Sequence, residues 1–318
     1  MIEVGSVPGR KAGPVEVAAP APGRALGDEP LWRWLTLSPA ALVLLLLTAL
    51  PVLNLVAMSF FRIEWVGGRA AWTPEGLANY AAVPGDGLFR AALVNTTVFV
   101  AAAVTVEMVL GLALALLCGR VGRGRTFYRA VFILPILVPG IVIGAIWKLM
   151  YNFDFGIINQ AGAALFGAMP RDWLGDPATA LLAVIVVDVW HWTPFCFLLL
   201  LASAEALPQE LYEAARIDGA SGWQELTRVT LPLLWPAIVV TFAFRAVVAF
   251  KVFDEVYLLT GGGPGTATEV LSFTIYQRFF AEDRVGYGSA LAVVAIFGVS
   301  LLLALTLSAR RGREGAAS

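Results

Sequence analysis

The sequence predicts an all-α integral membrane protein with six transmembrane helices, and composition, hydropathy and loop charge all indicate this class. Of its 318 residues, 59% are hydrophobic and 14% are charged. A soluble domain has roughly 45–50% apolar and about 25% charged residues. The formal net charge of −1 and the absence of a basic stripe argue against nucleic acid as a partner. The chain therefore belongs in a lipid bilayer.

Six segments are long and apolar enough to cross the membrane, which takes about 20 residues in a helix. They are Leu35–Phe60, Ala91–Leu117, Phe127–Met150, Ala178–Leu201, Leu233–Phe253 and Tyr287–Ala309. Pro135 and Pro139 lie inside the third segment and predict a kink there, because proline cannot donate a helical hydrogen bond. The first span, 35–60, stands apart from the remaining five, which form one domain over 91–309.

Loop charges orient these spans. Arginines gather before the first span, between the second and third, and after the sixth, whereas the loops on the other side are acidic or mixed. Since lysine and arginine mark cytoplasmic loops, both termini are predicted to be cytoplasmic. Residues 1–34 are rich in Pro, Gly and Ala and predict a disordered cytoplasmic tail, and 310–318 form a second, short one.

The loop at 202–235, between the fourth and fifth spans, is cytoplasmic by parity but carries more acids than bases. Its pattern predicts a helix after Pro208, a left-handed stop at Gly219, and a second helix over Gly222–Thr230 with Ser221 as its N-cap. A helix that lies on lipid would carry Lys and Arg on its polar face, and this one carries acids. The composition therefore favours a protein partner over an ordered loop or a lipid-surface helix.

The spacing of Glu213-Ala214-Ala215, Gly219, Val229 and Leu231-Pro232 resembles the EAA loop of bacterial ABC importer permeases, E-A-A-x3-G-x9-I-x-L-P, with Val229 in place of Ile. The resemblance implies a type I importer permease fold whose coupling helix docks on a separate ATPase subunit. The residues that it assigns to coupling are Glu213, Ala214, Ala215, Asp218, Gly219, Leu231 and Pro232.

Further stretches resemble the sugar-type branch of this family, similar to the maltose and glycerol-3-phosphate systems. They are Trp190–Phe195, Phe253–Gly265 and, less specifically, Phe155–Asn159 and Leu77–Tyr80. The resemblance implies the first of two related permease subunits. It also implies a second homologous permease, two ATPase copies and an extracytoplasmic solute-binding protein as partners.

Catalytic motifs are absent from the sequence. No G-x-x-x-x-G-K-[ST] is present, so no P-loop binds ATP, and the single His191 cannot build a zinc site alone. Cys118 and Cys196 lie in apolar runs and are expected to be free thiols. The chain is therefore predicted to be a non-enzyme without a cofactor of its own, with ATP and Mg²⁺ bound by the partner ATPase.

Charges within spans are costly and tend to face a cavity or a partner. Glu107, Asp188, Arg245 and Lys251 are such charges, and Asp188 either pairs with Arg245 or Lys251 or contacts substrate. Lys148 lies near a span end, where its long side chain is expected to reach toward the interface. The candidate substrate path, in which the aromatic residues could equally be helix packing, is Asn95, Arg245, Phe250, Lys251, Phe253 and Asp254.

The predicted function is a permease subunit in the bacterial inner membrane that forms half of the path for a sugar or sugar-like solute. The solute class includes disaccharides, oligosaccharides and glycerol-phosphate compounds. The alternative is a secondary transporter driven by an ion gradient, which would favour inverted repeats and broken helices that carry ion ligands.

Overall fold

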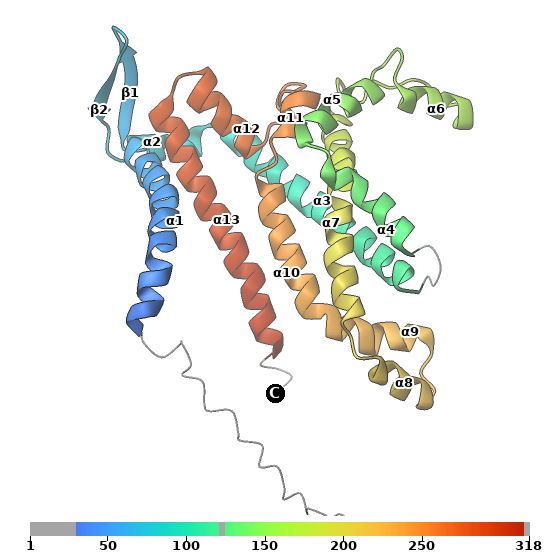
Figure 1. The fold of residues 1–318 in the computed structure, drawn as a ribbon. Helices are drawn as coiled ribbons and strands as arrows, with labels where there is room; N and C mark the ends of the chain where they lie inside the picture. Colours follow the sequence, from blue (N-terminus) through green and yellow to red (C-terminus); the bar gives the residue numbers. More distant parts are fainter. Residues whose placement is uncertain (1–29, 121–124, 315–318) are drawn as a thin grey trace, which may run out of the picture. The chain divides into compact units, whose positions relative to one another are not determined.

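The computed structural model describes residues 30–120 and 125–314 and is predominantly helical (Figure 1). The chain divides into two compact units, the first ending at Leu53 and the second beginning at Asn54. The first unit holds most of helix α1 (Pro30–Met58), whose window Thr36–Met58 is apolar enough to span a membrane.

The remaining elements follow in chain order. The α-helices are α2 (Ala78–Ala82), α3 (Gly87–Arg120), α4 (Arg125–Ile133), α5 (Gly140–Met150), α6 (Ile157–Phe166), α7 (Ala180–Glu205), α8 (Gln209–Ile217), α9 (Gly222–Gln224), α10 (Leu231–Phe250), α11 (Asp254–Leu259), α12 (Leu271–Tyr276) and α13 (Val285–Glu314). Two 3₁₀ segments, η1 (Val83–Gly85) and η2 (Leu134–Leu137), and two π-helical segments, η3 (Glu225–Thr230) and η4 (Gln277–Ala281), connect them. The strands are β1 (Phe61–Val66) and β2 (Arg69–Pro74).

Within the described residues, five helical stretches are long and apolar enough to cross a membrane, or six if one bent pair counts as a span. The five correspond to the predicted first, second, fourth, fifth and sixth spans; they are Thr36–Met58, Gly87–Gly119, Ala180–Glu205, Gly222–Leu259 and Val285–Ala304. The chain is thus a multi-span helical membrane protein.

The predicted third span is not one helix. Phe127–Leu137 and Gly140–Met150 meet at an angle of 94°. The break lies between Pro135 and Pro139, as the kink prediction required, but it is far sharper than a kink. α5 turns onto α11, and Gly140 and Gly144, one turn apart, permit this contact. A Cβ at Gly144 would lie 2.9 Å from the Cβ of Leu258.

The core of the bundle lies between α3 and α7. Phe99, Val184, Phe197 and Leu200 are fully buried there. Gly111 of α3 faces α7 so closely that a Cβ would lie 2.7 Å from the Cβ of Cys196. Small residues of this kind let helices approach in a bilayer, where packing rather than water exclusion holds them together. Cys196 and Cys118 are both free thiols, as predicted.

The all-α prediction omitted a β-hairpin. β1 and β2 pair antiparallel, with Ile63 opposite Trp72, and Gly67 and Gly68 form the turn with positive φ. The segment alternates apolar and polar residues, which is the strand period, but it is too short to register in a search for spans. Gly286 at the start of α13 holds the hairpin close, since a Cβ there would lie 1.9 Å from the carbonyl oxygen of Phe61.

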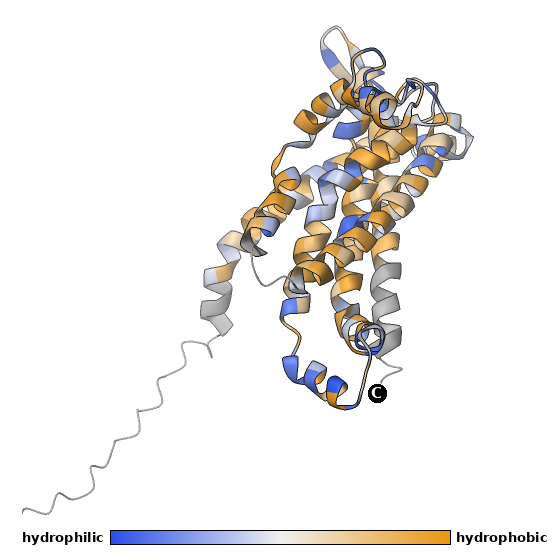
Figure 2. Cartoon of the chain, turned by 90° about the vertical axis from the view of Figure 1, so that its right-hand side faces the viewer, coloured by the Kyte–Doolittle hydropathy of each residue, from blue (hydrophilic) through white to orange (hydrophobic). Residues whose placement is uncertain are grey.

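The second unit has two different ends. The hairpin, α2, α11 and α12 lie at one end, and α8 and α9 lie at the other (Figure 1). Figure 2 shows apolar residues along the long helices and polar residues on α8. A further short apolar helix, α6, follows the broken third span and was not predicted.

Candidate functional site

The loop at 202–235 folds as the predicted helix–turn–helix. α8 ends at Ile217, and Gly219 follows with φ of 77°, the left-handed geometry that glycine adopts without strain. Ser221 begins the second helix with a capping box, because its side chain accepts from the Gln224 N–H while the Gln224 side chain accepts from the Ser221 N–H. The turn is therefore rigid on both sides of one glycine.

The second helix does not end at Thr230. α9 passes into the π-helical segment η3, and η3 passes directly into α10. Pro232 lies just after this junction, so the helix continues past a residue that has no backbone N–H to donate. The loop is thus a continuation of the fifth span, with α8 folded back beside it.

The predicted coupling residues fall into two groups. Glu213, Ala214, Ala215, Asp218 and Gly219 lie on α8 and its turn, all of them exposed except the half-buried Ala215, whereas Leu231 and Pro232 begin α10. Two apolar residues beside the turn were missed, since Ile217 is 86% exposed and Trp223 is 72% exposed. Large apolar side chains in a polar loop were the signal for them. Docking on an ATPase stays a prediction for all of these residues.

A group of three charges joins the long helices inside the bundle. Arg245 of α10 forms ion pairs with Glu107 of α3, at 2.9 Å between Nη2 and Oε1, and with Asp188 of α7. All three side chains are at most 2% exposed. Asp188 therefore pairs with Arg245 and not with Lys251. The Arg245 guanidinium also lies over the Trp192 ring, 4.8 Å from its centroid. Contact of Arg245 with substrate stays a prediction. The geometry gives Arg245 a structural role as well, because its ion pairs connect α10 to α3 and α7.

Beside these charges lies a cavity of about 430 Å³, formed by α5, α7, α10 and α11. Of the predicted path residues, Arg245, Lys251, Phe253 and Asp254 line it. Asp188, which the sequence offered as a possible substrate contact, lines the cavity from α7. Three other lining residues were not predicted, namely His191 and Trp192 from α7 and Glu255 from α11. His191 and Trp192 lie in the Trp190–Phe195 stretch that resembles the sugar-type branch, and that stretch was the available signal for them.

The two sides of this cavity are joined by buried polar contacts. His191 Nδ1 lies 3.2 Å from Glu255 Oε1, and each side chain is 7% exposed. Lys251 and Asp254 are exposed, and within the described residues Lys251 forms no ion pair. The cavity thus offers an aromatic face, charges of both signs and free hydrogen-bonding groups, which is the mixture that suits a polyhydroxylated solute.

Asn95 and Phe250 lie elsewhere. The Asn95 amide donates to the carbonyl oxygens of Thr266 and Glu269, at 2.8 and 2.9 Å, and so holds the loop before α12 onto α3. Phe250 lines a separate apolar groove of about 320 Å³ against α13. The structure therefore does not bring the six predicted path residues together. Lys148 was predicted to reach toward the interface, and its Nζ donates to the carbonyl oxygen of Leu258 at 2.9 Å.

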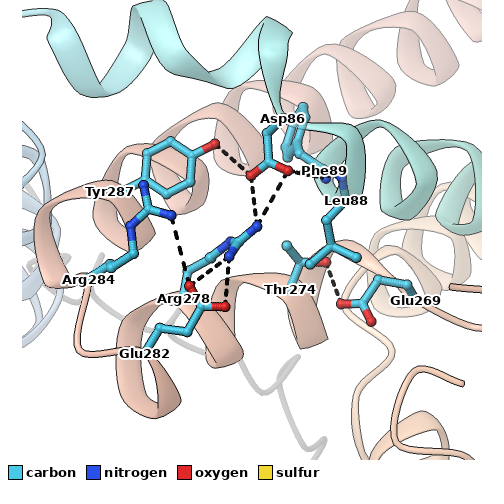
Figure 3. A network of polar contacts seen from close by, with 9 residues as sticks. All are labelled: Asp86, Leu88, Phe89, Glu269, Thr274, Arg278, Glu282, Arg284 and Tyr287. Atoms are coloured by element: carbon cyan, nitrogen blue, oxygen red, sulfur yellow. Dashed lines mark hydrogen bonds and ion pairs between the residues drawn. The ribbon is translucent and has the colours of Figure 1, made fainter. Parts of the chain in front are cut away.

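A polar network fastens the end of the bundle that carries the hairpin (Figure 3). Asp86 accepts from the Tyr287 hydroxyl at 2.9 Å and forms an ion pair with Arg278 at 3.2 Å. Burial by itself would raise the pKa of Asp86, but the hydrogen bonds from Tyr287 and Phe89 and the charge of Arg278 outweigh it, so this pKa is lowered. Burial raises the pKa of Glu269, which accepts from Thr274 at 2.6 Å.

A multi-span bundle with a helix–turn–helix in one loop and a polar cavity among its spans defines the class of membrane transport permeases. Within that class, the chain belongs to the family described as the binding-protein-dependent transport system inner membrane component, whose model matches residues 107–312. Members of this family are transport components of the inner membrane, which favours the importer prediction over the ion-driven alternative.

Curated relatives extend the match over most of the chain. The trehalose/maltose transport system permease protein MalF of Thermococcus litoralis is 37% identical over 278 residues, which cover 86% of this chain and 90% of that protein. The sulfoquinovosyl glycerol transport system permease protein SmoG of Agrobacterium fabrum is 36% identical over 276 residues, 87% of this chain and 88% of that protein. The chain is similar to sugar ABC permeases along nearly its whole length.

Among solved structures, a bacterial ABC transporter involved in the import of the acidic polysaccharide alginate has a similar chain, with a TM-score of 0.75 and 22% identity. The match covers 91% of this chain and all of that one. The same transporter type in complex with an alginate pentasaccharide-bound periplasmic protein gives a TM-score of 0.75 at 20% identity, covering 87% and 92%. These likenesses show the fold.

Proposed function

We propose that this chain forms half of the translocation path of an ABC importer for a sugar or sugar-like solute and receives energy from a separate ATPase through the loop at 202–235. The observation that supports this proposal is the position of α10: the helix–turn–helix precedes its first residue, and the cavity lies at its last turns. One continuous helix thus links the proposed solute site to the proposed ATPase site. The relatives transport trehalose, maltose or sulfoquinovosyl glycerol, which supports a sugar as cargo.

The partners follow from this role. A second, homologous permease supplies the other half of the path, two ATPase copies bind ATP and Mg²⁺, and an extracytoplasmic binding protein delivers the solute. The proposed orientation places α8 and α9 in the cytoplasm with both termini, because the arginine-rich segments lie on that side. The hairpin, α11 and α12 then face the binding protein.

Within the cavity, Trp192 is the aromatic face against which a sugar ring packs, and Lys251 and Asp254 are the exposed groups that hydrogen-bond its hydroxyls. Aromatic contacts of this kind contribute about 0.5–1.5 kcal/mol. We therefore expect Trp192→Phe to preserve uptake and Trp192→Ala to lower the apparent affinity for transported sugar about threefold to tenfold.

Uptake of labelled trehalose and maltose by cells that express the complete transporter measures this effect. The matched control is Trp190→Ala, on the same helix but outside the cavity, where the ring packs on Trp147. Co-purification with the ATPase verifies assembly of each variant. If Trp192→Ala, Lys251→Gln and Asp254→Asn all took up sugar as wild type does, the cavity would not be part of the translocation path. ATP hydrolysis by the isolated, pure chain would refute the proposed division of labour.

A further inference from the structure

The π-helical segment η3 contacts α8 at both of its ends. Its first residue, Glu225, accepts from Arg216 Nε at 3.0 Å. Its last residue, Thr230, lies 3.1 Å from the Tyr212 hydroxyl and donates to the carbonyl oxygen of Glu225 at 3.2 Å. Since Thr230 donates onward, the Tyr212 hydroxyl is the donor to Thr230. We call Tyr212, Arg216, Glu225 and Thr230 the α8 brace.

The brace occupies one side of α8. Tyr212 and Arg216 are four residues apart and therefore lie one above the other on the same helix face. Glu213 and Ile217, displaced from that face by one position, are exposed. The contact side is more enclosed: Thr230 is 6% exposed and the Glu225 side chain is 14% exposed. α8 is thus held on one side and open on the other.

Without the brace, α8 would be connected to η3 through the turn at 218–221 alone. In that turn the Gly219 and Ala220 N–H groups donate back to the carbonyl oxygens of Arg216 and Ala215, and Ser221 caps α9, so these bonds fix each helix end without joining α8 to η3. A partner that moved α8 would then move the turn and leave α10 where it was. The brace connects α8 to η3, and η3 runs without interruption into α10, so α8 is connected to α10 by side chains as well as by the turn.

We propose that the α8 brace transmits displacement of α8 to α10, and that its four members are positioning residues for transport. This inference rests on the proposed function, because it assumes an ATPase docked on α8. π-helical turns are rare in proteins, and those that occur are often found at functional sites. Here the first and last residues of η3, Glu225 and Thr230, are the two residues that bond to α8. The displacement reaches Arg245 and Lys251 at the far end of α10.

The test is the number of sugar molecules imported per ATP hydrolysed by the complete transporter in proteoliposomes with its binding protein. The variant Tyr212→Phe/Glu225→Gln keeps the size of both side chains, removes the Tyr212 hydroxyl that bonds Thr230, and reduces the ion pair of Glu225 with Arg216 to a neutral hydrogen bond. We expect it to co-purify with the ATPase and to hydrolyse ATP, while imported sugar per ATP falls about fivefold. Arg228→Gln is the matched control, because Arg228 lies on η3, is exposed, and has no ion pair among the described residues.

A charge exchange separates transmission from simple loss of a side chain. Arg216→Glu should lower imported sugar per ATP, and Arg216→Glu/Glu225→Arg should restore it to within about twofold of wild type. A wild-type ratio in Tyr212→Phe/Glu225→Gln would overturn the brace. Loss of ATPase binding in that variant would overturn it as well, since the four residues would then act in docking. Failure of the wild-type chain to bind any ATPase would instead refute the proposed function.

Discussion

The buried charges around Arg245 and the ion pair Arg216–Glu225 each have one member on the continuous helix of η3 and α10, and they differ in exposure and in number of partners. Arg245 is 0% exposed and has two carboxylate partners, whereas the Arg216 side chain is 66% exposed and has one. An exposed pair contributes about 0–1 kcal/mol. A buried charge that loses its partner costs far more, because it cannot recover its hydration. The three buried charges therefore hold α3, α7 and α10 together firmly, whereas the ion pair Arg216–Glu225 holds α8 to η3 only weakly.

Removal of the buried cation should have the largest effect. Arg245→Leu leaves Glu107 and Asp188 together in the bundle without a counter-charge, and we expect a loss of about 3–5 kcal/mol of stability. Thermal unfolding of the detergent-purified transporter and the yield of folded protein measure it. Lys251→Leu, at the C-cap of the same helix, is the control, since the Lys251 side chain is exposed and its loss should leave the unfolding temperature nearly unchanged. Equal unfolding temperatures for Arg245→Leu and wild type would show that the three charges are dispensable.

The turn of the loop should give the next largest effect, confined to function. Gly219→Val forces a β-branched residue to a φ of 77°, which costs about 1 kcal/mol or more. Gly219→Val and Glu213→Lys should abolish uptake and weaken ATPase binding, while the spans still insert. Gly222→Ala is the matched control, because Gly222 has no positive φ and open space around it. Wild-type uptake and ATPase binding in both variants would show that the loop is not the joint.

The smallest effect concerns the polar network at the other end. The pKa of Asp86 is lowered in the fold, so its ionised form stabilises the fold above its ordinary value of 3.8, and this contribution is lost as the pH falls below that value. The unfolding temperature of wild type should therefore fall more steeply than that of Asp86→Asn as the pH drops from about 6 to about 3. The raised pKa of Glu269 acts in the opposite direction, so Glu269→Gln should steepen the fall. Parallel curves for wild type and Asp86→Asn would contradict the assignment.

Hydropathy was sufficient to locate the spans, because a bilayer demands long apolar helices whatever the remaining sequence does. The loop was equally readable, since Gly219 and Ser221 determine its turn by local chemistry alone. The hairpin was not predicted, because its two strands have only six residues each and hydropathy identifies segments of about 20 apolar residues.

The cavity was harder to predict. Its members come from four elements that are distant in sequence, and hydropathy does not say which face of α10 meets which face of α7. Asn95 and Phe250 had suitable chemistry but point into other contacts. Pairing of Asp188 with Arg245 could be named as one alternative, and only the packing of α3, α7 and α10 decided it.

The sharp break at Pro135–Pro139 has a consequence for how the protein is made. During synthesis the segment 127–150 reads as a single apolar span of ordinary length, long before its final partner exists. α5 packs against α7 through Trp147 and Trp190, and against α11 through Gly144 and the bond from Lys148 to the Leu258 carbonyl. α11 is translated about a hundred residues after α5. We therefore expect α5 to enter the bilayer as a straight continuation of α4, and to bend into its final position once residues 254–259 have emerged from the ribosome. A ribosome stalled before that point would carry a straight third span, and the bend would be an event of late assembly.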